Sequence, residues 1–171
     1  MGTLDKDELI EKEIQDQQRN ISYDTKEYTV EIIVKKYQEG LEEDDNEFFV
    51  PDYQREFVWD DVRQSRFIES LLMGLPIPYI FLAETTQGRY EMVDGSQRIR
   101  TLAAFVSDEL KLKGLDKIKE INGVRFSQLP KSRQRKFLNI SLKMIVLSEL
   151  TTEESKNDIF ERINRGSDIL K

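Results

Sequence analysis

The 171-residue chain has 26 basic and 33 acidic side chains, a net charge of −7, and 38% hydrophobic residues, a composition typical of a soluble globular protein with one sizeable core. It contains neither Cys nor His, which excludes disulfides, thiolate or imidazole metal sites, Ser-His-Asp triads and an HNH-type nuclease centre within this sequence. No apolar run approaches the roughly 20 residues that span a membrane and no signal peptide opens the chain, so a cytoplasmic location is expected.

Residues 1–24 are expected to form a polar arm or surface helix. They are rich in Asp, Glu, Lys and Gln, and Leu4, Leu9, Ile10 and Ile14 supply only a thin apolar seam. Residues 25–171 are expected to form one domain. The sequence stops five residues after Gly166, and this abrupt end suggests a domain truncated at its C-terminus.

Between residues 29 and 94 the sequence predicts helices and strands in turn. Thr29 is a plausible N-cap for a helix over residues 30–37, and Asp60 or Asp61 caps a helix that Gly74 ends. Short apolar runs predict strands at 48–50, 79–83 and 90–93. The last two are separated by a polar turn and should pair as a hairpin.

The second half of the chain predicts a further set of elements. Residues 111–113 suggest a short edge strand, and Asn122-Gly123 is a hairpin-turn signal. Pro130 should open a basic helix, and residues 140–147 alternate as a core strand. Residues 151–154 read as a capping box for a last helix, which should end at Gly166 as its C′ residue.

Residues 90–102 carry the pattern on which the functional interpretation depends. A strand that ends at Asp94-Gly95 and opens directly into a helix leaves unpaired backbone N–H groups, and the helix dipole adds positive charge there. Gly95 would let a ligand approach closely, Ser96 could cap the helix or donate to a phosphate, and Arg98 could clamp it. The alternative is ordinary turn chemistry with a solvated Arg98.

Residues 51–59 form a loop with an unusual composition, because it combines large aromatic side chains with Gln54 and Arg55. Aromatic faces beside an Arg can sandwich a base or nucleotide ring. Alternatively, Phe57 and Trp59 anchor the loop to the core while Arg55 pairs with an acid.

A basic cluster follows in the second half of the chain and is the best local candidate for nucleic acid, although a solvated face also explains it. The overall acidic charge argues against a general nucleic-acid-binding surface but leaves room for a local groove. The cluster consists of Arg125, Lys131, Arg133, Arg135 and Lys136.

Four segments in the right order, at residues 51–59, 68–78, 94–98 and 160–166, resemble the DGQQR domain at the N-terminus of GmrSD-type modification-dependent restriction proteins and related phage-defence NTPases. The resemblance covers residues 25–171. It implies a compact α/β (α+β) fold like ParB and sulfiredoxin, with a small mixed sheet and surrounding helices. It also implies binding, often with hydrolysis, of a nucleoside triphosphate, coupled to DNA cleavage by an HNH nuclease domain.

The resemblance assigns site residues by motif position. Asp94, Gly95, Gln97 and Arg98 occupy the signature, Gln54 and Arg55 the Tyr-Gln-Arg positions, and Asn164 and Gly166 the Asn-x-Gly positions. The chain departs at Ser96, where the family usually has Gln, and this puts the hydrolytic step in doubt.

We therefore expect Asp94, Gln97 and Arg98 to be catalytic, with Arg98 stabilising phosphate charge. Asp94 would orient a water or hold Mg²⁺; equally, it could fix Arg98 or Arg55 by a salt bridge. The expected nucleotide-binding residues are Gln54, Arg55, Trp59, Gly95, Ser96, Arg100, Asn164 and Gly166.

The sequence thus predicts a regulatory domain of a restriction or phage-defence protein that binds a nucleoside triphosphate with Mg²⁺. Its expected partners are an HNH-type nuclease domain or subunit outside this chain, DNA through the full-length protein, and further copies in an oligomer. The rivals are a non-catalytic DNA-binding module that uses the basic cluster, and an interaction domain that has lost its ligand.

Overall fold

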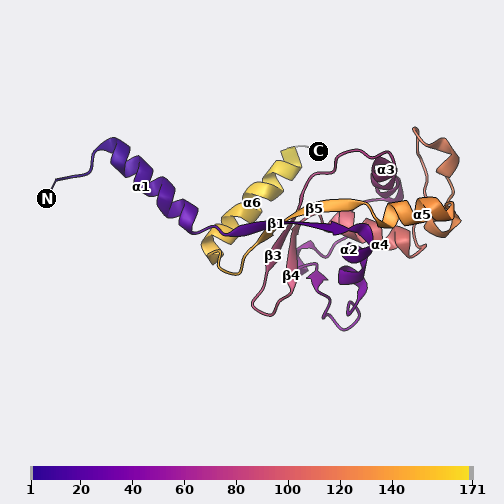
Figure 1. Cartoon of the computed structure of the whole chain (residues 1–171), viewed down its shortest axis with the longest axis horizontal. Helices are drawn as coiled ribbons and strands as arrows, with labels where there is room; N and C mark the ends of the chain where they lie inside the picture. Colours follow the sequence, from indigo (N-terminus) through magenta and orange to yellow (C-terminus); the bar gives the residue numbers. More distant parts are fainter. Residues whose placement is uncertain (1, 170–171) are drawn as a thin grey trace.

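The computed structural model describes residues 2–169, with side chains through residue 163. Five strands form one mixed sheet (Figure 1). The strands are β1 (Tyr23–Thr29), β2 (Phe48–Phe49), β3 (Ile80–Glu84), β4 (Tyr90–Asp94) and β5 (Ser141–Leu147). The α-helices are α1 (Lys6–Arg19), α2 (Val30–Gln38), α3 (Asp61–Leu72), α4 (Ser96–Val106), α5 (Lys131–Leu138) and α6 (Glu153–Ile169). The 3-10 helices are η1 (Asp52–Gln54), η2 (Lys119–Ile121) and η3 (Phe126–Gln128).

The strand order is β1-β5-β3-β4-β2, which mixes parallel and antiparallel pairs. β3 and β4 pair antiparallel, with Leu82 opposite Met92, so the predicted hairpin is confirmed. β5 runs parallel to β3 and antiparallel to β1, and β2 adds to β4 in parallel. The expected α/β (α+β) fold with a small mixed sheet is therefore confirmed.

Helices cover both faces of the sheet. Successive side chains on a strand point to opposite faces, so each face presents apolar residues to a helical layer. On one face the sheet meets α2, α3, α4 and α5 in the main core; on the other it meets α6 (Figure 1). The main core takes Leu82, Met92 and Met144 from the sheet, and the smaller one takes Ala83, Val93 and Leu147 against Ile159, Phe160 and Ile163. The sheet thus lies between two helical layers.

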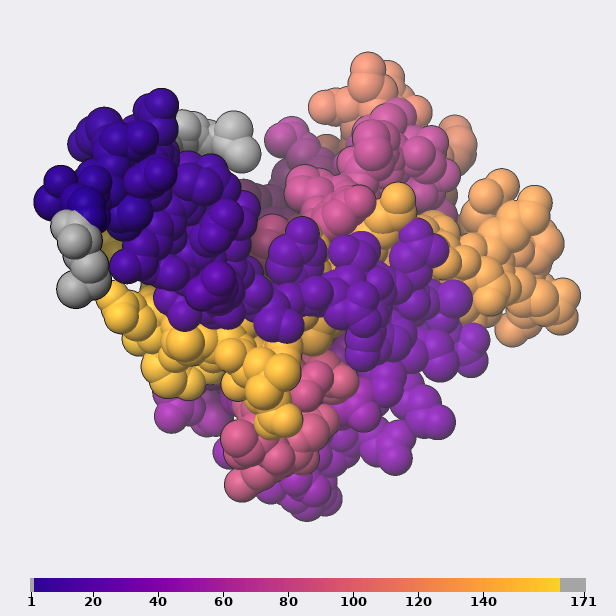
Figure 2. All heavy atoms as spheres, turned by 60° about the vertical axis from the view of Figure 1, so that its left-hand side comes forward, coloured from indigo at the N-terminus to yellow at the C-terminus, as the bar shows by residue number. Residues whose placement is uncertain are grey.

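Helix α1 extends away from this body (Figures 1 and 2). Asp5 caps it in a capping box with Glu8, and none of its residues is buried. The expected surface helix is therefore present. No helix within residues 2–169 has the length and apolar character needed to cross a bilayer.

Four local predictions were wrong. Residues 23–29 form β1, a strand that was not predicted, and residues 111–113 form no strand. Asn122-Gly123 forms the predicted turn, in which the N–H of Val124 donates to the carbonyl of Ile121 at 3.1 Å, but no strands flank it and the expected hairpin is absent. α6 continues through residue 166 to Ile169 instead of ending there.

The predicted capping box before α6 also differs in register. Thr152 caps the helix by accepting from the N–H of Ser155 at 3.2 Å, so the third helical residue is Ser155 and not Glu154. Thr151 is buried and binds the backbone of Ser22 instead.

Candidate functional site

The junction between β4 and α4 is formed as the sequence predicted. β4 ends at Asp94, Gly95 follows at φ 103°, and α4 begins at once with Ser96. A Cβ at Gly95 would lie 3.0 Å from Cγ1 of Ile80 and 3.2 Å from Nη2 of Arg98. Glycine is therefore required at this position for two reasons: the backbone is left-handed, and a side chain would have no space.

Gly95, and not Ser96, is the N-cap of α4. Ser96 is the first helical residue and is buried, so the expected capping role for its hydroxyl was wrong. Because Gly95 has no side chain, it provides no side-chain cap for the first-turn N–H groups of α4. The helix dipole adds partial positive charge at the same point.

Arg98 lies on the side of α4 that faces the entry to β3. Its side chain is only 11% exposed; it donates to the carbonyl oxygens of Pro78 and Tyr79 and lies 3.5 Å from Oδ2 of Asp94. Burial lowers the pKa of the Arg98 guanidinium, and the carboxylate of Asp94 counteracts part of this effect. Arginine keeps its charge in proteins, so a cation is held beside the first turn of α4.

Gln97 lies on the other side of the helix and holds the aromatic loop. Its Oε1 accepts from the N–H groups of Val58 at 3.0 Å and Trp59 at 3.1 Å, and its Nε2 donates to the carbonyl of Glu56 at 3.1 Å. Both ends of the amide are therefore occupied by backbone, which positions residues 56–59 against α4. Its catalytic role stays a prediction.

Arg100 is the second contact between α4 and this loop. Its Nη2 donates to the carbonyl of Arg55 at 2.8 Å, and its guanidinium lies 5.2 Å from the ring centroid of Phe57. Its Nη1 is buried without a hydrogen-bond partner among the described residues. A buried guanidinium N–H that lacks an acceptor is costly, and an anion or a water would satisfy it.

The loop itself carries the other predicted residues. Nε2 of Gln54 donates to the carbonyl of Val93 at 2.8 Å, which places Gln54 at the end of β4. The guanidinium of Arg55 pairs with Asp52 at 2.8 Å and with Asp44 at 3.7 Å, and it is half exposed.

Trp59 packs edge-on against Phe67, with ring centroids 5.8 Å apart, and Arg63 lies 4.8 Å from the Trp59 centroid. It therefore anchors the loop to the body. The side chain of Asn164 lies outside the described residues, and Gly166 lies within α6.

Three further residues, which were not predicted from the sequence, tie the loop to α6. The hydroxyl of Tyr53 donates to Oε1 of Glu91 at 2.9 Å, and Nζ of Lys156 lies 3.2 Å from Oε2 of the same carboxylate. Glu91 and Lys156 are 13% and 19% exposed. The only sequence signal for this contact was an acidic residue, Glu91, inside an otherwise apolar strand.

The junction provides few ligands for a metal ion by itself. Among the described residues, no group of three or more Asp or Glu side chains is placed to hold a cation. A Mg²⁺ ion at Asp94 would therefore need phosphate oxygens and waters as its other ligands.

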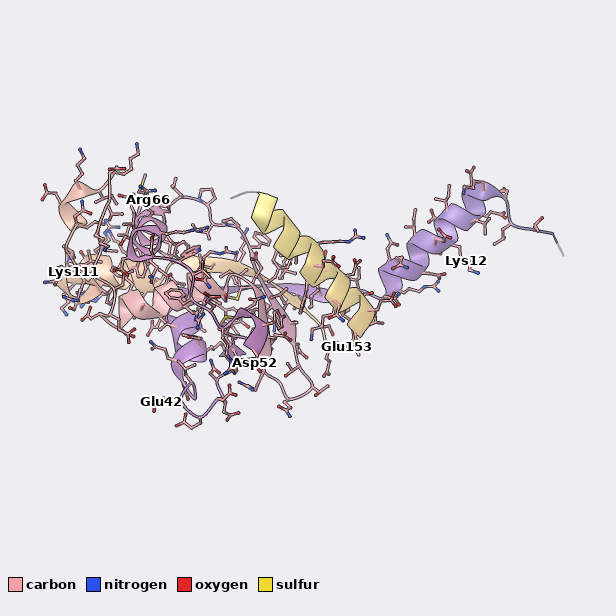
Figure 3. The ribbon with its side chains drawn as sticks, turned by 180° about the vertical axis from the view of Figure 1, so that it is seen from behind. Lys12, Glu42, Asp52, Arg66, Lys111 and Glu153 are labelled. Atoms are coloured by element: carbon pink, nitrogen blue, oxygen red, sulfur yellow. The ribbon has the colours of Figure 1, made fainter. Side chains whose placement is uncertain are left out.

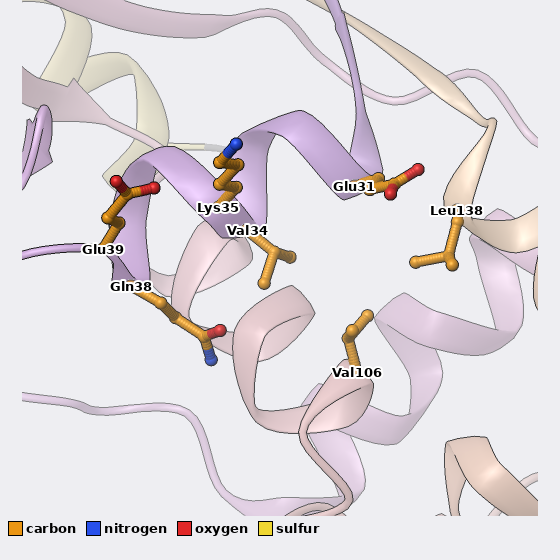
Figure 4. A pocket seen from close by; sticks show the side chains of 7 residues that line it. All are labelled: Glu31, Val34, Lys35, Gln38, Glu39, Val106 and Leu138. Carbon is orange, nitrogen blue, oxygen red and sulfur yellow. The ribbon is translucent and has the colours of Figure 1, made fainter.

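Two surface hollows lie away from the junction. One, of about 490 Å³, has Val34, Val106 and Leu138 pointing into it (Figure 4). The other, of about 500 Å³, is lined by residues that include Lys111, Lys113 and Arg125.

Comparison with protein-family models shows a match over residues 30–171 to the family described as the GmrSD restriction endonuclease, N-terminal domain. Comparisons with curated proteins and with solved structures gave no match. The expected likeness to ParB and sulfiredoxin therefore stays a prediction.

Proposed function

The chain belongs to the family of GmrSD restriction endonuclease N-terminal domains, and from this premise we propose that it binds a nucleoside triphosphate with Mg²⁺ and hydrolyses it. In this proposal the domain regulates DNA cleavage by a nuclease domain or subunit. The observation that carries the proposal is the β4–α4 junction, where the helix N-terminus opens directly from a strand and its N-cap, Gly95, has no side chain to occupy the space beside it.

The residues around the junction suit a phosphate chain chemically. The first-turn N–H groups of α4 are donors, Arg98 adds a positive charge close by, and Nη1 of Arg100 lacks an acceptor. A Mg²⁺ ion would neutralise the phosphates, with Asp94 as its protein ligand. Arg98 already binds two carbonyl groups, so its role is a fixed positive charge more than a free clamp.

Hydrolysis of a nucleoside triphosphate is accelerated mainly by preorganised hydrogen-bond donors that stabilise the charge on the phosphates, and much less by covalent chemistry. The protein supplies these donors on the rigid start of α4, while Gln97 and Arg100 hold the aromatic loop beside them. Phe57 is 39% exposed and offers a face on which a nucleobase can stack.

Calorimetry of residues 1–171 with GTP, ATP, CTP and UTP in the presence of Mg²⁺ tests binding, and a phosphate-release assay tests hydrolysis. We expect one or more nucleotides to bind, and Arg98→Ala and Arg100→Gln each to weaken binding about tenfold or more. Arg66→Gln removes an exposed charge from α3 and should bind like the wild type. Thermal unfolding of each variant establishes that it is folded.

Absence of heat with all four nucleotides would overturn the proposal for this chain and favour an interaction domain without a ligand. Binding that survives in a folded Arg98→Ala/Arg100→Gln double variant would place the nucleotide elsewhere and would also overturn it.

A further inference from the structure

Residues 110–138 carry a charge opposite to that of the whole chain. They contain nine basic and only two acidic side chains, a net charge of +7, whereas the whole chain carries −7. The remaining residues therefore carry −14. The nine are Lys111, Lys113, Lys117, Lys119, Arg125, Lys131, Arg133, Arg135 and Lys136; we call residues 110–138 the basic end.

The basic end is one contiguous part of the fold. The N–H of Leu112 donates to the carbonyl of Val124 at 3.0 Å, which joins its first and middle segments. Gln134 on α5 donates to the carbonyls of Ser127 and Leu129, which joins α5 to η3. Lys111 and Lys12 of α1 lie at opposite ends of the molecule (Figure 3).

All nine basic residues are exposed. Only Lys113 forms an ion pair among the described residues, with Asp61 at 3.6 Å. A protein that needs these charges merely for solubility would intersperse both signs on its surface. Here one sign is gathered on one end, which creates a local positive potential that attracts a polyanion.

The kinds of side chain on the basic end indicate which polyanion it binds. Among the described residues, none of the large hydrophobic side chains that are exposed belongs to the basic end, whereas the centres of protein interfaces are enriched in such side chains and membrane-surface helices insert an apolar face. Its aromatic side chains, Phe126 and Phe137, are buried and stack on Phe105. Single-stranded nucleic acid is bound by exposed aromatic platforms, whereas a duplex backbone requires only cations.

We propose that the basic end binds the phosphate backbone of double-stranded DNA without reading its sequence. Because the chain belongs to a family of restriction endonuclease domains, DNA is the polyanion that we expect the basic end to meet. The surface is separate from the β4–α4 junction: the junction lies at the first turn of α4, while Phe105 at its last turn packs on the basic end. Along the helix axis, Ser96 and Phe105 are therefore about 14 Å apart, at 1.5 Å per residue.

Fluorescence anisotropy of a labelled DNA duplex, titrated with residues 1–171 over a range of salt concentrations, tests the proposal without nucleotide. We expect log K to fall linearly with log salt. The triple variant Arg133→Gln/Arg135→Gln/Lys136→Gln should weaken binding at least tenfold at low salt and reduce the slope by about 2 to 3. The control Lys6→Gln/Lys12→Gln/Arg19→Gln changes the net charge equally at the other end and should bind like the wild type.

Three results would overturn the proposal. They are no binding at about 50 mM salt, equal loss in both triple variants, or preference for single-stranded over duplex DNA. Nucleotide calorimetry on the α5 triple variant should match the wild type, so failure of this proposal and failure of the nucleotide proposal are distinguishable.

Discussion

Gly95 sets the geometry from which the candidate site follows. We predict that Gly95→Ala destabilises the protein by about 2 to 4 kcal/mol, because it adds a steric clash with Ile80 to the cost of a left-handed backbone. Gly74→Ala is the matched control: its φ is 76° and its Cβ would meet nothing within 4 Å, so it should cost only about 1 kcal/mol. Urea unfolding measures both, and equal losses would contradict the role of Ile80.

At the residue scale, the sequence identified the junction but not the partners of its side chains. An Asp-Gly step between a strand and a helix pattern is a local signal, and it located Gly95 correctly. The hydrogen bonds of Gln97 to residues 56–59 join segments about forty positions apart, and no local pattern encodes such a contact. No local pattern encodes the hydrogen bonds from Arg98 to the carbonyls of Pro78 and Tyr79 either.

Between elements, Gln97 links α4 to the aromatic loop, and the only Trp of the chain reports on that link. We predict that Gln97→Ala increases quenching of Trp59 fluorescence by acrylamide, because the loop loses three hydrogen bonds. Gln134→Ala is the control, since Gln134 binds two carbonyls in a loop remote from Trp59; its fluorescence should not change. Unaltered quenching in Gln97→Ala would show that other contacts hold the loop.

The Glu91–Lys156 pair links the sheet to α6. Both side chains are largely buried, so we predict that Glu91→Gln and Lys156→Met each cost about 1 to 3 kcal/mol by leaving a partner unpaired. A double-mutant cycle should give a coupling of about 1 kcal/mol or more. The exposed pair Lys113–Asp61, 3.6 Å apart, should give about 0 to 1 kcal/mol. A coupling no larger than that of the exposed pair would contradict this link.

Asp108 connects the end of α4 to η3 in the basic end, and its effect depends on pH. The N–H of Ser127 donates to its carboxylate at 2.9 Å and lowers the pKa of Asp108. A carboxyl whose folded pKa is lowered stabilises the protein above its unfolded pKa, about 3.9, and loses this effect as the pH falls. Asp108→Asn, which tolerates the positive φ of 61°, should therefore lower the Tm at pH 7.

The same comparison at low pH provides the control, because a protonated Asp108 and an Asn are then both neutral. We expect the difference in Tm to shrink as the pH falls through the lowered pKa of Asp108. A difference that persists unchanged would mean that the substitution acts through shape and not charge.

At the element scale, helices with N-caps and apolar strands were predictable, and polar or irregular elements were not. α2, α3, α4, α5 and β5 have the expected patterns. β1 is a polar edge strand that pairs over seven residues with β5; its Tyr and Thr content was the only signal, and tertiary pairing decides such a strand. Asn122-Gly123 was predicted correctly as a turn, but the segments on either side of it form no strands.

Over the whole molecule, basic and acidic residues are concentrated at opposite ends of the longest axis. The basic end lies at one extreme and the largely acidic remainder, including α1, extends to the other (Figures 1 and 3). α4 connects the candidate nucleotide site to the basic end through Phe105. The sequence indicated five of the nine basic residues; of the other four, Lys111 and Lys113 fell in the expected edge strand and Lys117 and Lys119 in the segment after it.

The measurement that tests the central claim most directly is an NMR titration of the backbone amides with a non-hydrolysable nucleoside triphosphate and Mg²⁺. We predict that the largest shifts occur at the first-turn amides of α4, residues 96–98. Binding that leaves these amides unchanged, with shifts gathered elsewhere, would contradict a phosphate site at the β4–α4 junction.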